Sequence, residues 1–183
     1  MKRLEPDEIL QLSEHHQWKA RTGYSVFVLD RGKLRLDYPR DWVWSKDDDS
    51  FKFRDREPPD DRCTLALSLW QAEGLAREIP LERLLQGILD GDGRTPIARG
   101  EVVEERRGGL ELAWVEMKFV DQNERREAVA RWCLARDGGL QAILSLDFWP
   151  EDGDWVGPVW DNVLASLELE RPIADPRVGP ITH

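Results

Sequence analysis

Apolar and polar residues alternate most regularly between residues 101 and 149, where the pattern predicts four consecutive strands. Short turns rich in Gly, Asp and Asn separate these strands, at residues 108–109, 121–123 and 137–139. Such residues accept the backbone conformations of tight hairpin turns. In the last strand every second residue from Leu140 to Phe148 is apolar, which is typical of a strand with one buried face. The stretch predicts an antiparallel meander of strands Glu101–Arg107, Leu110–Val120, Arg126–Ala135 and Leu140–Trp149.

Shorter β-rich segments precede the meander. They predict strands at Tyr24–Leu29, Lys33–Tyr38, Phe51–Arg54 and Cys63–Trp70. Pro39 is expected to end the second of these strands, so that residues 41–44 form a loop or short connection. The segment Cys63–Trp70 is apolar on nearly every position, and this favours a central place in the sheet with both faces covered.

Three helices are expected. A thin apolar face over Pro6–Gln17, with Pro and acidic residues in the first turn, predicts a peripheral helix. The strongest helical pattern runs from Pro80 to Asp90 and stops at Gly91. A third helix is expected to begin at Gly157-Pro158. The buried stripe of the second helix is Leu81, Leu84, Leu85, Ile88 and Leu89. That of the third helix is Trp160, Val163, Leu164 and Leu167.

These elements predict an α+β fold, with one mostly antiparallel sheet of six or seven strands flanked by helices. At 183 residues the chain is long enough for one substantial core. We therefore expect a peripheral N-terminal helix in residues 1–20, a single domain over residues 21–171 and an extended tail over residues 172–183.

The balance of charge narrows the partners. A formal net charge of −10, from 36 acidic and 26 basic residues, disfavours nucleic acid and anionic membrane surfaces, which would repel it. No apolar run approaches the roughly 20 residues of a membrane span. The first eight residues become acidic where a signal peptide needs its apolar core. We expect a cytoplasmic protein without membrane insertion.

The two cysteines give no sign of redox chemistry. Cys63 and Cys133 both fall inside predicted strands, which favours buried free thiols over a disulfide or a redox pair. The pattern leaves open whether the two residues are neighbours in the sheet.

Catalytic and metal-binding motifs are weak throughout. His15 and His16 lie on the thin terminal helix and His183 ends the chain, so they are poorly placed for a metal site or a nucleophilic relay. The run from Asp90 briefly resembles a calcium loop, but Arg94 and Thr95 stand where an oxygen ligand and a glycine are required. The acidic runs are typical of solvated loops, and no nucleotide-binding or nucleophile-elbow motif occurs. We expect no enzyme activity, no cofactor and no metal.

Nine tryptophans are the unusual feature of the composition. Four of them lie near predicted strand ends and loops, and we identify them as candidate binding residues because aromatic residues are enriched in interfaces: Trp42, Trp44, Trp149 and Trp155. The alternative is that they cap the ends of the core, since tryptophan is mostly buried. Four others fall within elements and are expected in the core: Trp70, Trp114, Trp132 and Trp160.

The order of elements resembles the Mog1/PsbP-like superfamily, which includes DcrB-type bacterial proteins. The resemblance covers residues 22–170 and is carried by the strand leading into Tyr38-Pro39 and Trp42, by the helix Pro80–Asp90 and by the closing segment Val159–Leu167. It implies an α/β sandwich without a conserved catalytic apparatus, used by its members for binding and assembly. Several members carry a secretion or lipoprotein signal. No functional residue of the family can be placed on this sequence.

The resemblance and the absent catalytic motifs favour a non-catalytic cytoplasmic protein-binding or chaperone-like adaptor module, with another protein as its partner. One alternative is a small-molecule or lipid-binding domain with a pocket between sheet and helix, lined by Trp and an acidic residue and capable of hydrolysis. A pocket of a few hundred Å³ with convergent polar groups would favour that reading. A second alternative is an acidic immunity-type protein that neutralises a basic partner.

Overall fold

The structure, a computed structural model, describes residues 2–3, 12–47, 50–72, 78–171, 173, 175 and 177–179. Its helices are α1 (Leu81–Gly91) and α2 (Gly153–Ser166), with short 3-10 turns η1 (Asp30–Gly32) and η3 (Pro150–Asp152). Its strands are β1 (Lys2–Arg3), β2 (Tyr24–Leu29), β3 (Leu34–Pro39), β4 (Val43–Asp47), β5 (Ser50–Arg54), β6 (Cys63–Gln71), β7 (Pro96–Arg99), β8 (Val103–Arg107), β9 (Leu110–Asp121), β10 (Arg126–Asp137), β11 (Leu140–Phe148) and β12 (Glu168–Leu169).

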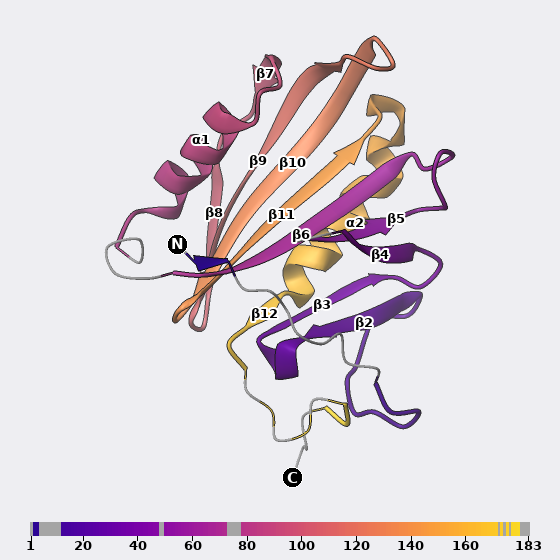
Figure 1. Ribbon diagram of the computed structural model, residues 1–183, viewed down its shortest axis with the longest axis vertical. Helices are drawn as coiled ribbons and strands as arrows, with labels where there is room; N and C mark the ends of the chain where they lie inside the picture. The colour runs from indigo at the N-terminus through magenta and orange to yellow at the C-terminus, as the bar shows by residue number, and fades with distance from the viewer. Residues whose placement is uncertain are drawn as a thin grey trace.

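The strands form two antiparallel sheets (Figure 1). In the described residues, nine strands build the large sheet in the order β4-β5-β6-β11-β10-β9-β7, with β1 beside β6 and β8 beside β9. The small sheet has the order β12-β3-β2. The α+β class expected from the sequence is confirmed, but the large sheet has more strands than the six or seven expected, and a second sheet accompanies it.

The predicted meander is present. Strands β8, β9, β10 and β11 follow one another as antiparallel neighbours, and β11 then pairs with β6. The turns use the residues expected of them, since Gly108 and Gly138 take φ values of 58° and 52°. Strand β6 lies inside the sheet between β5 and β11, as its apolar sequence predicts.

Several boundaries differ from the sequence predictions. Residues 43–47 form strand β4 rather than a loop, because they pair as a hairpin with β5 although most of their side chains are exposed. Strand β7 was not predicted, since all four of its residues are exposed and show no buried face. Helix α2 begins at Gly153 rather than Gly157, and Pro158 lies inside it in the second turn, where the missing N–H removes one backbone hydrogen bond.

The two ends of the chain also differ from expectation where they are described. Residues 12–20 contain a turn at residues 14–15 and no helix, so the helix predicted over Pro6–Gln17 is wrong for residues 12–17. The rest of that predicted helix lies outside the described residues. The backbone N–H of Ser13 donates to the carbonyl of Arg177, and that of Gln17 donates to Val178. The described part of the tail therefore pairs with the segment 12–17.

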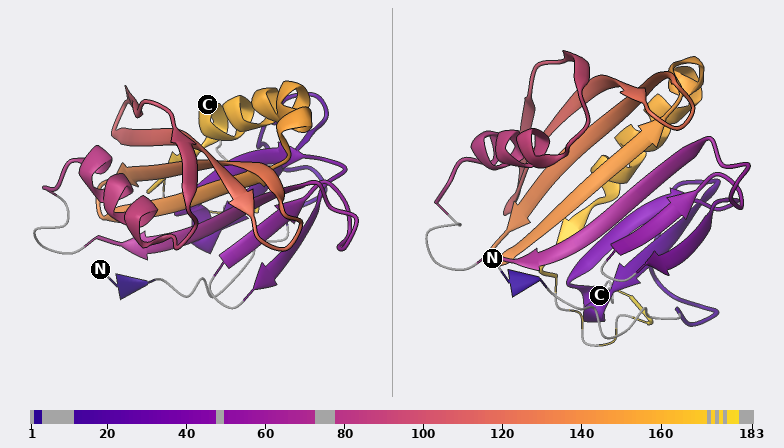
Figure 2. Two further views of the ribbon diagram at one scale, coloured as in Figure 1. Left: turned by 90° about the horizontal axis from the view of Figure 1, so that it is seen from above. Right: turned by 45° about the horizontal axis from the view of Figure 1, so that its top comes forward.

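The large sheet is covered on both faces (Figure 2). Helix α2 and the small sheet pack on one face, where a continuous core includes Leu67, Leu144 and the fully buried Trp160. Helix α1 packs on the other face through Leu81, Leu85 and Leu89. No helix in the described part of the chain is long and apolar enough to cross a membrane.

A buried ion pair joins the small sheet to the end of α2 and to the N-terminal segment. The Arg35 Nη2 and Asp37 Oδ1 atoms on β3 lie 2.6 Å apart, and both residues are less than a tenth exposed. The Arg35 guanidinium also donates to the carbonyls of Ser166 and Lys19, each at 2.8 Å. Burial raises the pKa of Asp37 and the charge of Arg35 opposes this rise. One guanidinium thus fixes three segments that are distant in the sequence.

Removing one partner of this pair is expected to leave a buried charge without compensation. We predict that Arg35→Met lowers the free energy of unfolding by about 3–5 kcal/mol near neutral pH, as measured by chemical denaturation. Without Arg35 the pKa of Asp37 rises further, so the folded state binds the proton more tightly than the unfolded chain. The deficit relative to the parent chain should therefore shrink as the pH falls toward about 4.

The double variant Arg35→Met/Asp37→Leu is the control, because it removes both charges. It is expected to recover most of the lost stability. A double variant as unstable as the single one, or a deficit that does not depend on pH, would contradict this role for the pair.

Candidate functional site

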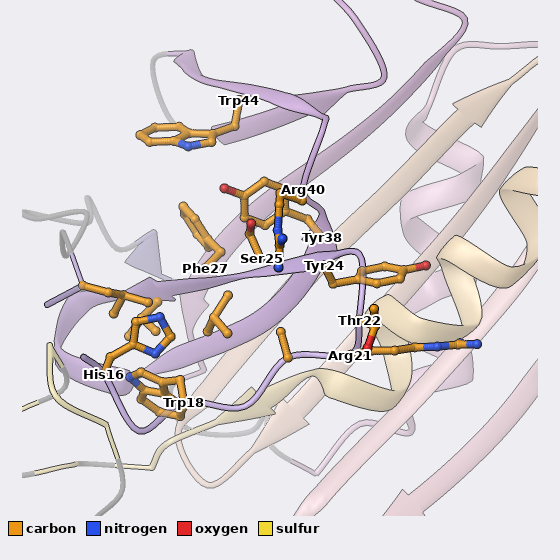
Figure 3. A pocket seen from close by; sticks show the side chains of 14 residues that line it. His16, Trp18, Arg21, Thr22, Tyr24, Ser25, Phe27, Tyr38, Arg40 and Trp44 are labelled. Atoms are coloured by element: carbon orange, nitrogen blue, oxygen red, sulfur yellow. The ribbon is translucent and has the colours of Figure 1, made fainter. Parts of the chain in front are cut away.

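A groove of about 880 Å³ follows strand β2 (Figure 3). Trp44 stands on one side of β2, and His16 and Trp18 stand on the other. Consecutive residues of β2, from Tyr24 to Val28, line the groove. Because successive side chains of a strand point to opposite faces, the groove wraps around the edge of the strand instead of lying on one face.

Strand β2 is an edge strand. It ends the order β12-β3-β2, so that none of the described strands pairs with its outer side. Tyr24 lies opposite Pro39, and the Arg40 N–H donates to the Gly23 carbonyl at 2.9 Å. In an antiparallel ladder this places Ser25, Phe27 and Leu29 in the hydrogen-bonded pairs with β3. The backbone N–H and C=O groups of Val26 therefore point outward along the groove.

The inner wall of the groove is aromatic and firmly supported. Phe27 contacts Phe53 and Phe51 with ring centroids 5.0 and 5.2 Å apart, and Trp44 packs edge-on against Phe27 at 6.0 Å. Tyr38 packs against Phe53 at 5.0 Å, and its side chain hydrogen bonds with Ser25. Burial raises the pKa of the Tyr38 hydroxyl, which stays neutral near pH 7. These contacts hold the side chains of the inner wall in place without a ligand.

The outer wall comes from the N-terminal segment. Trp18 is buried, the Arg35 guanidinium lies 5.9 Å from its ring centre, and His16 is half-buried beside it. Gly179 packs against Trp18 and has a φ of 93°. A Cβ at this glycine would lie 2.9 Å from the backbone nitrogen of Trp18. The wall therefore depends on the described part of the C-terminal tail.

Charge in the groove is opposite in sign to that of the whole chain. None of the described residues that line the groove is Asp or Glu, although the sequence holds 36 acidic residues. Arg21 and Arg40 both line the groove and are both exposed. Among the described residues neither guanidinium has an ion-pair partner. The groove thus combines an open strand edge, aromatic side chains and unpaired positive charge.

The four tryptophans expected to bind do not form one patch. Trp42 is buried at 6% exposure and contacts Trp155 with ring centroids 6.5 Å apart. Trp155 is 39% exposed and its indole N–H donates to Asp152. Trp44, 40% exposed, lies in the groove. Trp149 packs near Met117 on the α1 face of the large sheet, beneath the guanidinium of Arg126.

Two further cavities are smaller than the groove along β2. One of about 520 Å³ lies where α1 begins and is lined by Glu104, Glu105 and Glu111 together with two arginines. Another of about 210 Å³ contains Arg94, which forms ion pairs with Asp92 and Asp147. No group of three or more metal-ligating side chains is placed to hold an ion within the described ranges. His15 and His16 are on the N-terminal segment, and His183 lies outside those ranges.

The cysteines are free, buried and not neighbours. Cys63 lies opposite Phe148 and Cys133 lies opposite Leu144, so that strand β11 separates them. Burial raises the pKa of both thiols. The expectation of buried free thiols is confirmed.

The large sheet with helices on both faces is a PsbP-like α+β fold. The fold superposes on the solution structure of cyanobacterial PsbP (CyanoP) from Synechocystis sp. PCC 6803 with a TM-score of 0.57 and 15% identity, over 82% of this chain and 94% of that one. A crystal structure from Bacteroides thetaiotaomicron gives a TM-score of 0.57 and 14% identity. That match covers 82% of this chain and 50% of the Bacteroides chain.

The chain belongs to the Alr1449 family, whose pattern it matches over residues 25–173. A relative from Nostoc sp. (strain PCC 7120), described as uncharacterized protein alr1449, is 37% identical over 174 residues. The match spans 94% of this chain and 91% of the relative. The PsbP-like fold that the sequence resemblance implied is confirmed.

The thiols provide a test of the packed core. We predict that neither Cys63 nor Cys133 reacts with a disulfide reagent in the native protein at about pH 8, because buried thiols with raised pKa values supply little thiolate. Both should react at once in concentrated guanidinium chloride, as followed by the absorbance of the released thiolate. Rapid reaction of either thiol in the folded protein would contradict the packing described.

Proposed function

We propose that this chain is a non-catalytic protein-binding module that takes an extended segment of a partner protein along strand β2. The observation that carries the proposal is the outer edge of β2, which no described strand pairs with and which lies inside an aromatic groove. An extended peptide can add to such an edge through main-chain hydrogen bonds, while pockets for alternate side chains supply specificity.

The composition of β2 supports this use. Soluble proteins usually protect a free strand edge with charged residues, proline, a bulge or a covering element. Strand β2 has the sequence Tyr-Ser-Val-Phe-Val-Leu and carries none of these protective residues. Strand β4, at one edge of the large sheet, contrasts with it because Lys46 and Asp47 place charges along that strand.

The geometry of the groove also supports an extended occupant. Its walls stand on opposite faces of one strand, as an added strand requires, since its side chains would point alternately toward Trp44 and toward Trp18. The spaces between the large sheet and its two helices are filled by buried side chains. This packing gives less support to a small-molecule pocket between sheet and helix, although a groove of 880 Å³ has the size of a small-molecule site.

Site-specific photo-crosslinking tests the proposal. We predict that a benzophenone side chain in place of Trp44 forms a discrete protein adduct in extracts of the source cells. The same group in place of Trp155, which is as exposed but lies outside the groove, should form none. The adduct should disappear on Val26→Pro, which removes the outward N–H, and persist on Val26→Thr, which keeps it.

Proline is tolerated at strand edges, and retained cooperative thermal unfolding of both Val26 variants is the folding control. Equal adducts at both tryptophan positions, no adduct at all, or an adduct that survives Val26→Pro would contradict binding along β2.

A further inference from the structure

The groove also indicates the chemistry of the segment that it binds. Resting on the proposed function, we infer that the partner segment carries acidic side chains and places them at the Tyr24 end of β2. The rest of the segment presents apolar or aromatic side chains to Phe27, Trp44 and Trp18.

The first support is the position of the two arginines. Arg21 precedes β2, and Arg40 directly follows Pro39, which lies opposite Tyr24. Both residues therefore lie at the same end of β2. A guanidinium offers several N–H donors in a planar fork that suits a carboxylate, and such charge-assisted hydrogen bonds are among the stronger ones in proteins.

The second support is that these guanidiniums are available. Most other described arginines form ion pairs, as Arg131 does with Glu116 and Arg136 with Glu111. Arg21 and Arg40 form none with the described residues, and no carboxylate is among the described residues that line their groove. In a chain with a net charge of −10, this local excess of positive charge is complementary to an acidic ligand.

The third support is the change in side-chain burial along β2. From Phe27 onward the residues of β2 are buried, whereas Tyr24, Ser25 and Val26 are half-buried. Trp44 is 40% exposed and packs on Phe27, and the buried Trp18 also lines the groove. A segment that is acidic along its whole length would fit the arginines but would bury charge against these aromatic rings, which is unfavourable.

The net charge of the chain adds selectivity. A chain with a net charge of −10 repels acidic proteins in general. A carboxylate therefore adds to binding affinity only when it reaches the arginines at the end of β2. Discrimination then depends on the spacing between the acidic and apolar side chains of the segment.

Selection from a random 12-residue peptide display library against the full-length protein tests this inference. The enriched sequences should contain Asp or Glu beside β-forming apolar or aromatic residues. Synthetic, C-terminally amidated versions should bind about tenfold more weakly to Arg40→Glu, as measured by fluorescence anisotropy. Arg83→Glu is the matched control: Arg83 is exposed on α1, has no ion pair with the described residues and undergoes the same change of charge. It should leave affinity unchanged.

The possible failures are distinguishable. Enriched peptides without acidic residues that still lose affinity on Val26→Pro would overturn the acidic partner and leave strand addition intact. Peptides that bind Val26→Pro as tightly as the parent chain would overturn strand addition itself. An equal loss of affinity for Arg40→Glu and Arg83→Glu would show a general charge effect and overturn the role of Arg40. A selection that enriches no peptide would overturn both proposals.

Discussion

The packing of Phe27 against Phe51 and Phe53 is the contact on which the arrangement of the site depends. It presses the small sheet onto the large one, near the edge where β4 and β5 form a hairpin. The buried pair Arg35–Asp37 holds the opposite side of the small sheet to α2 and to the N-terminal segment. Together these contacts hold β2 in place while leaving its outer edge without a strand partner in the described chain.

An open edge is a hazard for a soluble protein unless it is used or protected. Strand β2 lies in a concave site between Trp44 and Trp18, which limits access to a segment that fits between them. The arginines at one end restrict the choice further by charge. The same geometry that favours one extended ligand therefore disfavours pairing between copies of this acidic chain.

Local patterns predicted the elements well, but they could not predict the pairing at the edges. Strands β9, β10 and β11 and helix α1 follow from alternation and helical spacing that are visible over eight or more residues. Strands β4 and β7 were not predicted because their mostly exposed side chains carry no such pattern. Trp44 was the one predicted binding residue that lies in the groove, and the rest of the site was missed for a related reason. Whether Val26 lies on a free edge depends on the order of strands in the folded sheet, and whether Trp42 is buried depends on α2.

Amide hydrogen exchange of Val26, measured by nuclear magnetic resonance, tests the central claim most directly. Phe27 is hydrogen bonded to β3, whereas the Val26 N–H points into the groove. The Val26 amide should exchange at least about tenfold faster than that of Phe27 in the free protein, and should become protected when a selected peptide is bound. Equal protection of the two amides in the free protein would mean that the edge is already paired, and would contradict a groove open to an added strand.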